Sequence, residues 1–186
     1  MLSFTAVHTL TGCLLVADAE ADALGWGTPV TLLLIHDRPH LTGGPMPLRE
    51  MRSVEFPLRR GDVLADPAGI PALLDRVAAH LHQRPYLSAL DTILGVVRWS
   101  APDAELRAWA ICYTDSLTIG GQPRQVRRID AVDTDGRLYQ LTRLRGEDHP
   151  LLAVDDTPDP DGAPATYPGL SALLAATARV ADGGAA

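Results

Sequence analysis

The residues whose types and spacing could do chemistry lie in one segment, His36-Asp37-Arg38-Pro39-His40. Two imidazoles four residues apart can share a metal ion when a helix carries them, but Pro39 excludes a helix here. A loop at the end of a strand could still bring His36, Asp37 and His40 together. A zinc site usually needs three or more protein ligands, and no further ligand is identifiable. A small metal-dependent hydrolase that uses these three residues is therefore an alternative hypothesis, and no cofactor is predicted.

A second candidate site is a group of five arginines at one end of a predicted β-hairpin. The group consists of Arg124, Arg127, Arg128, Arg143 and Arg145. Arg127 is expected opposite Arg143, and like charges directly across a ladder are destabilising. Such a cluster could bind an acidic partner, or it could be a solvated edge relieved by Asp130, Glu147 and Asp148. We take the partner-binding interpretation as the leading hypothesis.

The hairpin that positions these arginines is predicted between residues 126 and 144, around the turn sequence Asp133-Thr134-Asp135-Gly136. A two-residue turn at Asp135-Gly136 would mix polar and apolar groups on both faces. A type I turn followed by Gly136 in the left-handed conformation pairs Asp133 with Arg137 instead. A one-residue slip exchanges the two faces, so the apolar pattern favours this second register. The face expected to be buried carries Ile129, Ala131, Tyr139 and Leu141.

The rest of the chain supplies further candidate elements. Strands are predicted at residues 3–10, 12–16, 29–36, 52–58, 92–99, 106–114 and 151–154. The apolar run at 29–36 indicates a central strand buried on both faces, and Pro57 places 52–58 at an edge. Helices are predicted at residues 18–24, 72–84 and 169–180. The segment 115–125, with Gly120-Gly121 and Pro123, is expected to be a loop of unusual length, and such loops are often functional.

These elements predict an α+β fold, in which an antiparallel sheet of about six strands with a C-terminal β-meander packs on two main helices. Residues 1–154 form the expected single domain, 155–168 an acidic proline-rich linker, and 169–186 a C-terminal helix and tail. The leucine stripe of that helix is expected to dock on its own sheet. Alternatively, it lies in the groove of a partner or of a second copy.

Composition narrows the class of protein. The formal net charge of −7 argues against general nucleic-acid binding, which needs a basic footprint. All sixteen basic residues are Arg, which is typical of a bacterial G+C-rich genome. Cys13 and Cys112 have apolar neighbours and no metal or redox spacing, so they are expected in the core. No apolar run reaches membrane-spanning length and no signal peptide is recognised, so a cytoplasmic protein is predicted.

We expect, from the sequence, a non-catalytic binding or accessory module for a protein or acidic partner. The arginine end of the hairpin and the 115–125 loop would form its surface, and a homodimer is a further option. The hydrolase is the first alternative. A second alternative is a small-ligand sensor domain, which would need a closed apolar cavity beneath Trp99, Trp109 and Tyr139.

Overall fold

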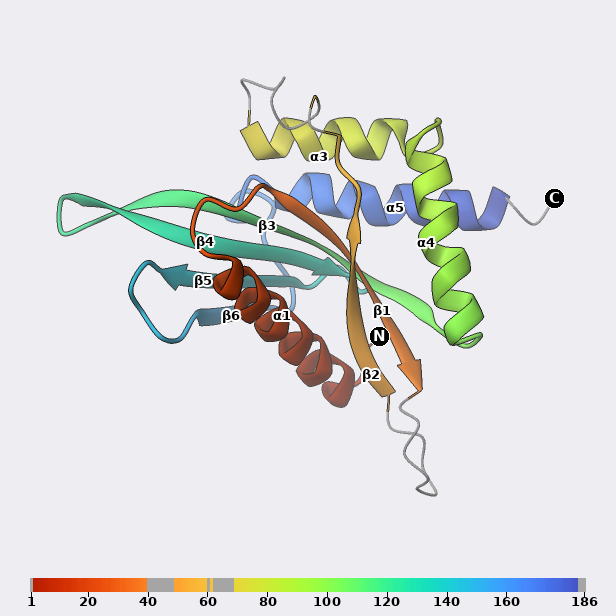
Figure 1. The fold of residues 1–186 in the computed structure, drawn as a ribbon, viewed down its shortest axis with the longest axis horizontal. Helices are drawn as coiled ribbons and strands as arrows, with labels where there is room; N and C mark the ends of the chain where they lie inside the picture. Colours follow the sequence, from red (N-terminus) through yellow and green to blue (C-terminus); the bar gives the residue numbers. More distant parts are fainter. Residues whose placement is uncertain (1, 40–48, 60, 62–68, 184–186) are drawn as a thin grey trace.

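The structure, a computed structural model, describes residues 2–39, 49–59, 61 and 69–183. In this part of the chain six strands form one antiparallel sheet in the order β2-β1-β3-β4-β5-β6 (Figure 1). The strands are β1 (Thr31–Pro39), β2 (Arg49–Phe56), β3 (Glu105–Ile119), β4 (Gln122–Asp133), β5 (Leu138–Leu144) and β6 (Leu151–Asp155). The helices are α1 (Phe4–Leu24), α3 (Gly69–His80), α4 (Tyr86–Ser100) and α5 (Tyr167–Gly183). The predicted α+β class, the six-stranded sheet and the C-terminal meander β3–β6 are confirmed.

The β4–β5 hairpin has the predicted register. Ile129 pairs with Leu141, Ala131 pairs with Tyr139, and Gly136 adopts a φ of 83°. The Asp133 side chain accepts hydrogen bonds from the backbone N–H groups of Asp135 and Arg137 at 2.8 and 3.0 Å, which closes the turn. The predicted face is fully buried: Ile129, Ala131, Tyr139 and Leu141 all have 0% exposure.

Helices cover both faces of the sheet, so two separate cores form. The helix α1 packs on one face, and Leu10 and Leu14 at 0% exposure join the same cluster as Ile129. Burying a leucine side chain contributes about 1.5–3 kcal/mol, so these two residues alone hold α1 firmly. The helices α3, α4 and α5 cover the other face, where Trp109 lies at the centre and stacks edge-on against Phe56. The hairpin is thus buried on both faces, where the sequence pattern predicted one.

The strands predicted at 3–10 and 12–16 are wrong, because both stretches belong to α1. The Ser3 hydroxyl caps this helix by accepting a hydrogen bond from the Ala6 N–H at 3.2 Å. The buried residues Leu10, Leu14 and Asp18 repeat every four positions, which is helical spacing. The alternation in the first ten residues was too short to outweigh this longer pattern. The predicted end of the helix at Gly25 is confirmed, and its φ is 92°.

Two further predictions are corrected. Residues 92–99 form part of α4 rather than a strand, and the buried Leu90 and Val97 are two turns apart on its inner side. Residues 115–125 are not a loop, because β3 and β4 continue through them to a two-residue turn. Gly120 and Gly121 occupy that turn with φ of 59° and 81°, and Ile119 pairs with Gln122. The result is a long two-stranded arm that projects beyond the helices (Figure 1).

The remaining elements follow the predictions closely. The strand β1 is buried on both faces, β2 lies at the edge of the sheet, and α3 matches the predicted helix at 72–84. The helix α5 packs on α3 and on the sheet through Leu170 and Leu173, so it docks on its own chain. This approach needs Gly169, because a Cβ atom there would lie 2.5 Å from the Cβ of Leu74. None of the described helices is both long and apolar enough for a membrane span.

Candidate functional site

A cavity of about 590 Å³ lies between α4 and α5, against the ends of β1 and β3. Its wall consists of His36, Leu94, Val97, Arg98, Ala104, Glu105, Leu106, Thr134, Leu174, Ala175, Thr177 and Ala178. Most of these side chains are apolar. Ligand sites for small molecules are typically about 300–1,000 Å³ in volume and combine apolar walls with a few polar groups. The cavity fits that description.

His36 lies in the cavity wall because β1 and β3 change register beside it. Ile35 pairs with Ala108 but His36 pairs with Leu106, so Arg107 is an extra residue in β3. Such a bulge redirects side chains and is common next to binding sites. The imidazole is 5% exposed, and Nδ1 lies 3.5 Å from the carbonyl oxygen of Asp37. Within the described residues, this is the one hydrogen bond of the ring, and Nε2 has none.

Burial lowers the pKa of His36 below its ordinary value of 6.5. The hydrogen bond to the Asp37 carbonyl opposes this effect, whereas the positive charge of Arg38 adds to it. The ring is therefore neutral at pH 7. A neutral imidazole in an apolar wall can donate or accept one hydrogen bond without bringing a charge into the cavity.

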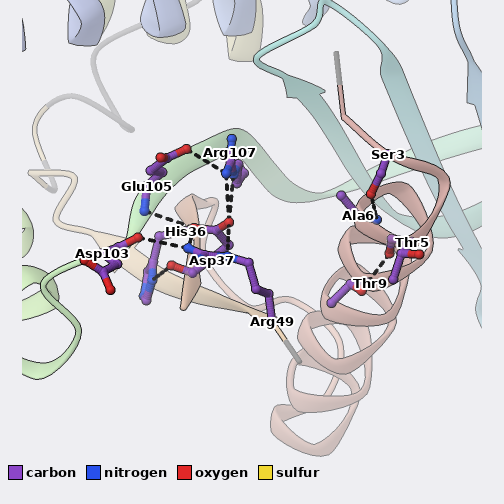
Figure 2. A network of polar contacts seen from close by, with 10 residues as sticks. All are labelled: Ser3, Thr5, Ala6, Thr9, His36, Asp37, Arg49, Asp103, Glu105 and Arg107. Carbon is purple, nitrogen blue, oxygen red and sulfur yellow. Dashed lines mark hydrogen bonds and ion pairs between the residues drawn. The ribbon is translucent and has the colours of Figure 1, made fainter. Parts of the chain in front are cut away.

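Asp37, the next residue, is the centre of a cluster of arginines (Figure 2). Arg49 donates to both carboxylate oxygens at 2.8 Å, and Arg107 donates twice to Oδ2 at 3.0 and 2.9 Å. The Glu105 N–H donates to Oδ1 at 3.0 Å. Burial alone would raise the pKa of the Asp37 carboxyl, but these donors outweigh it and the pKa lies below 3.8. The cluster ties β1 to β2 and holds the first residue of β3, which is part of the cavity wall.

The metal-site hypothesis gains no support from this arrangement. Both oxygens of Asp37 already accept hydrogen bonds from guanidinium groups, so a metal ion would have to displace them. Over the described ranges, no group of three or more His, Cys, Asp or Glu side chains is placed to hold a metal. His40 lies outside the described residues, and the hydrolase hypothesis stays untested to that extent.

Arg98 is the one cationic side chain in the cavity wall. It lies on the last turn of α4, is exposed, and has no hydrogen bond or ion pair with any residue that the structure describes. The hydroxyl of Thr177 is occupied, because it donates to the Leu173 carbonyl at 2.8 Å and accepts from the Trp109 indole at 3.1 Å. The Glu105 carboxylate is paired with Arg107 at 2.6 Å. Within the described residues, the polar side chains of the wall that keep a group without a hydrogen bond or ion pair are thus Arg98, His36 and Thr134.

The predicted arginine site is divided by the structure. Arg127 does lie opposite Arg143, as predicted, but a third residue separates their charges. Asp18 of α1 is 0% exposed and accepts from Arg143 Nε at 2.8 Å, and its Oδ1 lies 3.5 Å from Arg127 Nη1. Arg127 also donates to Asp22 at 3.0 Å and stacks on Trp26, with 4.7 Å to the ring centroid. These two arginines attach α1 to the sheet and are 1% and 8% exposed.

Of the other three arginines, Arg145 lies near this pair, with its guanidinium 5.9 Å from the centroid of the same Trp26 ring, and Arg124 and Arg128 lie elsewhere. Arg124 is exposed on the projecting arm, and Arg128 lies 3.6 Å from Asp115 on the opposite face of the sheet. Arg145 donates to the Gln125 side chain at 2.6 Å. The structure therefore does not gather the five arginines into one patch, and their role in partner binding stays a prediction.

The three aromatic residues beneath which a ligand cavity was predicted do not lie together. Trp99 is 88% exposed, and Trp109 and Tyr139 are buried on opposite faces of the sheet. The cavity near His36 is a different one. Sequence reasoning selected His36 and Asp37, but it missed Arg98, because the stretch around it was interpreted as a strand. It also missed Asp18, because residues 3–10 and 12–16 were predicted as strands and the long helix α1, which places Asp18 against the sheet, was not expected.

No family model, no curated protein and no solved structure matches this chain. The function must therefore be argued from the geometry of the site itself.

Proposed function

We propose that the protein is a non-catalytic binding module that holds a small, mainly apolar carboxylic acid in the cavity between α4 and α5. The observation that carries this proposal is the combination of a mostly apolar wall with two polar groups, the neutral imidazole of His36 and the guanidinium of Arg98, which has no ion pair among the described residues. Arginine matches a carboxylate with two parallel hydrogen bonds. A molecule with an alkyl or aromatic body and an anionic head satisfies both parts of the cavity.

The hydrogen bonds around the cavity, among the residues that the structure describes, support binding rather than catalysis. A general base needs a partner that orients it and a nucleophile within hydrogen-bond reach. His36 contacts only the carbonyl of Asp37, while the Asp37 carboxylate is held by Arg49 and Arg107. Among the described residues of the wall, no nucleophile is hydrogen-bonded to the His36 ring.

Decanoate and decanol, which share an alkyl chain and differ in charge, provide a direct test. Decanoate should raise the thermal midpoint, since a ligand at 100 times its Kd stabilises a protein by about 2.7 kcal/mol. Decanol should bind at least tenfold more weakly. Ala178→Trp, which fills the cavity, should abolish the decanoate shift. Equal shifts for both ligands, or an unchanged shift in Ala178→Trp, would contradict the proposal.

The variant Arg98→Gln tests how much the positive charge of Arg98, rather than apolar packing, contributes to decanoate binding, and it has a matched control. It should weaken decanoate binding about tenfold and leave decanol binding unchanged. Arg179→Gln removes an exposed arginine of α5 that lies outside this cavity, so it should change neither. The same loss in both variants would mean that decanoate responds only to net charge.

The pH dependence tests the role of His36. A bound carboxylate favours the protonated ring and raises its pKa, so binding takes up a proton. Decanoate affinity should therefore increase as the pH falls from about 7.5 towards 6, and His36→Gln should remove this increase. An affinity that is independent of pH in the unmodified protein would place the carboxylate away from His36.

A further inference from the structure

The strand β6 forms one edge of the sheet, and it is far more apolar than an unpaired edge normally is. It pairs with β5, and all five of its residues, from Leu151 to Asp155, are exposed. Within the described residues its other side has no strand neighbour. Half of its backbone N–H and C=O groups therefore point outwards, where they can pair with another strand.

The side chains of β6 add an apolar surface to these backbone groups. Leu151 is 73% exposed, Leu152 36% and Val154 40%. Leu152 pairs with Leu141 and Val154 with Tyr139, so both continue the apolar face of the sheet beyond the area that α1 covers. An incoming strand would bury these two side chains on one face and Leu151 on the other.

The opposite edge shows the protection that β6 lacks. The strand β2 carries alternating charges, Arg49, Glu50, Arg52 and Glu55, of which Glu50 is bound to Arg38 at 2.5 Å and to Arg52 at 3.2 Å. Charged side chains along an edge prevent pairing with another chain. A five-residue strand whose single charge is at its last position has no such protection.

Charge around β6 indicates which strand it would accept. Six carboxylates lie between residues 146 and 161, and this stretch contains no Arg or Lys. They are Glu147, Asp148, Asp155, Asp156, Asp159 and Asp161. Arg137 neutralises Asp156 at 2.7 Å. In the sequence, Glu147 and Asp148 precede the strand, Asp155 is its last residue, and Asp159 and Asp161 follow it. A second copy of this chain would bring the same negative charge against them, whereas a basic segment would be attracted.

We propose that β6 binds an extended segment of a partner protein, apolar at its centre and flanked by Arg or Lys, as an added strand of the sheet. The backbone supplies the affinity through ladder hydrogen bonds, and the alternate apolar side chains and acidic flanks supply the specificity. This surface lies on β6 and its flanks, away from the α4–α5 cavity, so it is independent of the proposed ligand site.

The test uses two synthetic peptides with a common centre, Val-Thr-Val-Thr-Val, flanked at both ends by Arg-Arg or by Glu-Glu. Fluorescence anisotropy should show binding of the Arg-flanked peptide to the full chain, at least tenfold tighter than the Glu-flanked peptide. The affinity should fall as salt increases, since exposed charges are screened. Hydrogen exchange should show new protection at residues 151–155 when the Arg-flanked peptide is bound.

Variants locate the site. Leu151→Gln together with Val154→Gln should weaken binding of the Arg-flanked peptide about tenfold or more, since both apolar contacts are lost while the charge is unchanged. Val96→Gln, at a 63% exposed position of α4, makes the same kind of change elsewhere and should leave binding unchanged. Circular dichroism confirms that each variant is folded before binding is compared.

Three results would overturn the proposal. The first is equal binding of the two peptides, because charge would then play no part. The second is bound peptide without protection at residues 151–155. The third is a dimer in sedimentation that Leu151→Gln with Val154→Gln dissociates, because the occupant of β6 would then be a second copy of this chain.

Discussion

Two buried aspartates each hold two arginines in this protein, but their surroundings differ. Asp18 has 0% exposure, and its partners Arg127 and Arg143 are almost as deeply buried. Asp37 is nearly as buried, at 3% for the side chain, but Arg49 is 42% exposed and Arg107 is 24% exposed. One cluster is sealed between a helix and the sheet, and the other opens towards solvent.

The exposure of the arginines determines what each cluster contributes to stability and to binding. Water can reach the guanidinium groups under α1 only when this helix detaches from the sheet. Loss of the Asp18 carboxylate therefore leaves two buried charges without compensation, and we expect it to weaken the attachment of α1. Arg49 and Arg107 are partly exposed, so water molecules can replace many of the hydrogen bonds that the Asp37 carboxylate accepts from them. The Asp37 cluster also holds Glu105, a residue of the cavity wall, so we expect its effects to appear in ligand binding as well as in stability.

The largest effect is expected for Asp18→Asn. It leaves Arg127 and Arg143 buried without their shared anion, and breaking a buried ion pair in this way costs about 3–5 kcal/mol of the free energy of unfolding. Urea denaturation measures the loss. Asp22→Asn is the control, because Asp22 contacts the same Arg127 but is 44% exposed, and should cost less than about 1 kcal/mol.

Replacing the whole Asp18 cluster tests the reason for that loss. The triple variant Asp18→Leu, Arg127→Met, Arg143→Met removes all three charges together and should recover most of the stability that Asp18→Asn loses. If the triple variant is as unstable as Asp18→Asn, the loss comes from packing under α1 and the electrostatic distinction between the two clusters fails.

The next effect in size is expected for Asp37→Asn. Its exposed partners can turn to water, so the loss should be about 1–3 kcal/mol, the range for removing one partner of a hydrogen-bonded group. Decanoate affinity should also fall, because the Glu105 backbone is held less firmly. Asp18→Asn, measured in buffer where it is fully folded, should bind decanoate normally. A normal decanoate affinity in Asp37→Asn would mean that the Asp37 cluster does not influence the cavity.

A smaller effect is expected from pH. The folded-state pKa of Asp37 lies below its ordinary value of 3.8, so its contribution to stability is present above that value and is lost as the pH falls through the folded pKa. The stability difference between the unmodified protein and Asp37→Asn should therefore be constant from about pH 7 to 5 and narrow below about pH 4. A difference that widens on acidification would reverse the assigned direction of the shift.

Local signals were enough to predict one part of the fold. The β4–β5 hairpin follows from a turn sequence and an alternating apolar pattern, both contained within nineteen residues, and its register was correct to the residue. The run 29–36 and the helix at 72–84 are of the same kind. In each of these, local conformational preference and the apolar pattern agree with the final packing.

The secondary-structure predictions were wrong where the local conformational preference of the residues differs from what packing requires. Residues 92–99 contain Thr92, Ile93, Val96 and Val97, which favour strands, yet the stretch is helical. In the helix, Leu90, Ile93 and Leu94 share the inner side and pack on the core. The candidate site failed for a related reason. A pair of facing arginines was correctly predicted, but the carboxylate between them comes from Asp18, more than a hundred residues away, and no short-range pattern could have indicated it.

Single arginine variants give the sharpest comparison between the clusters, and the smallest loss of stability is expected for Arg49→Gln. Arg49→Gln removes a guanidinium that is 42% exposed and leaves Arg107 on Asp37, so it should cost about 0.5–1 kcal/mol. Arg143→Gln removes a guanidinium that is 9% exposed and leaves Asp18 with its other partner 3.5 Å away, so it should cost several times more. Urea denaturation of the two variants side by side gives the ratio. Equal losses would mean that exposure of the arginine, which is the main difference between the clusters, does not determine what each ion pair contributes.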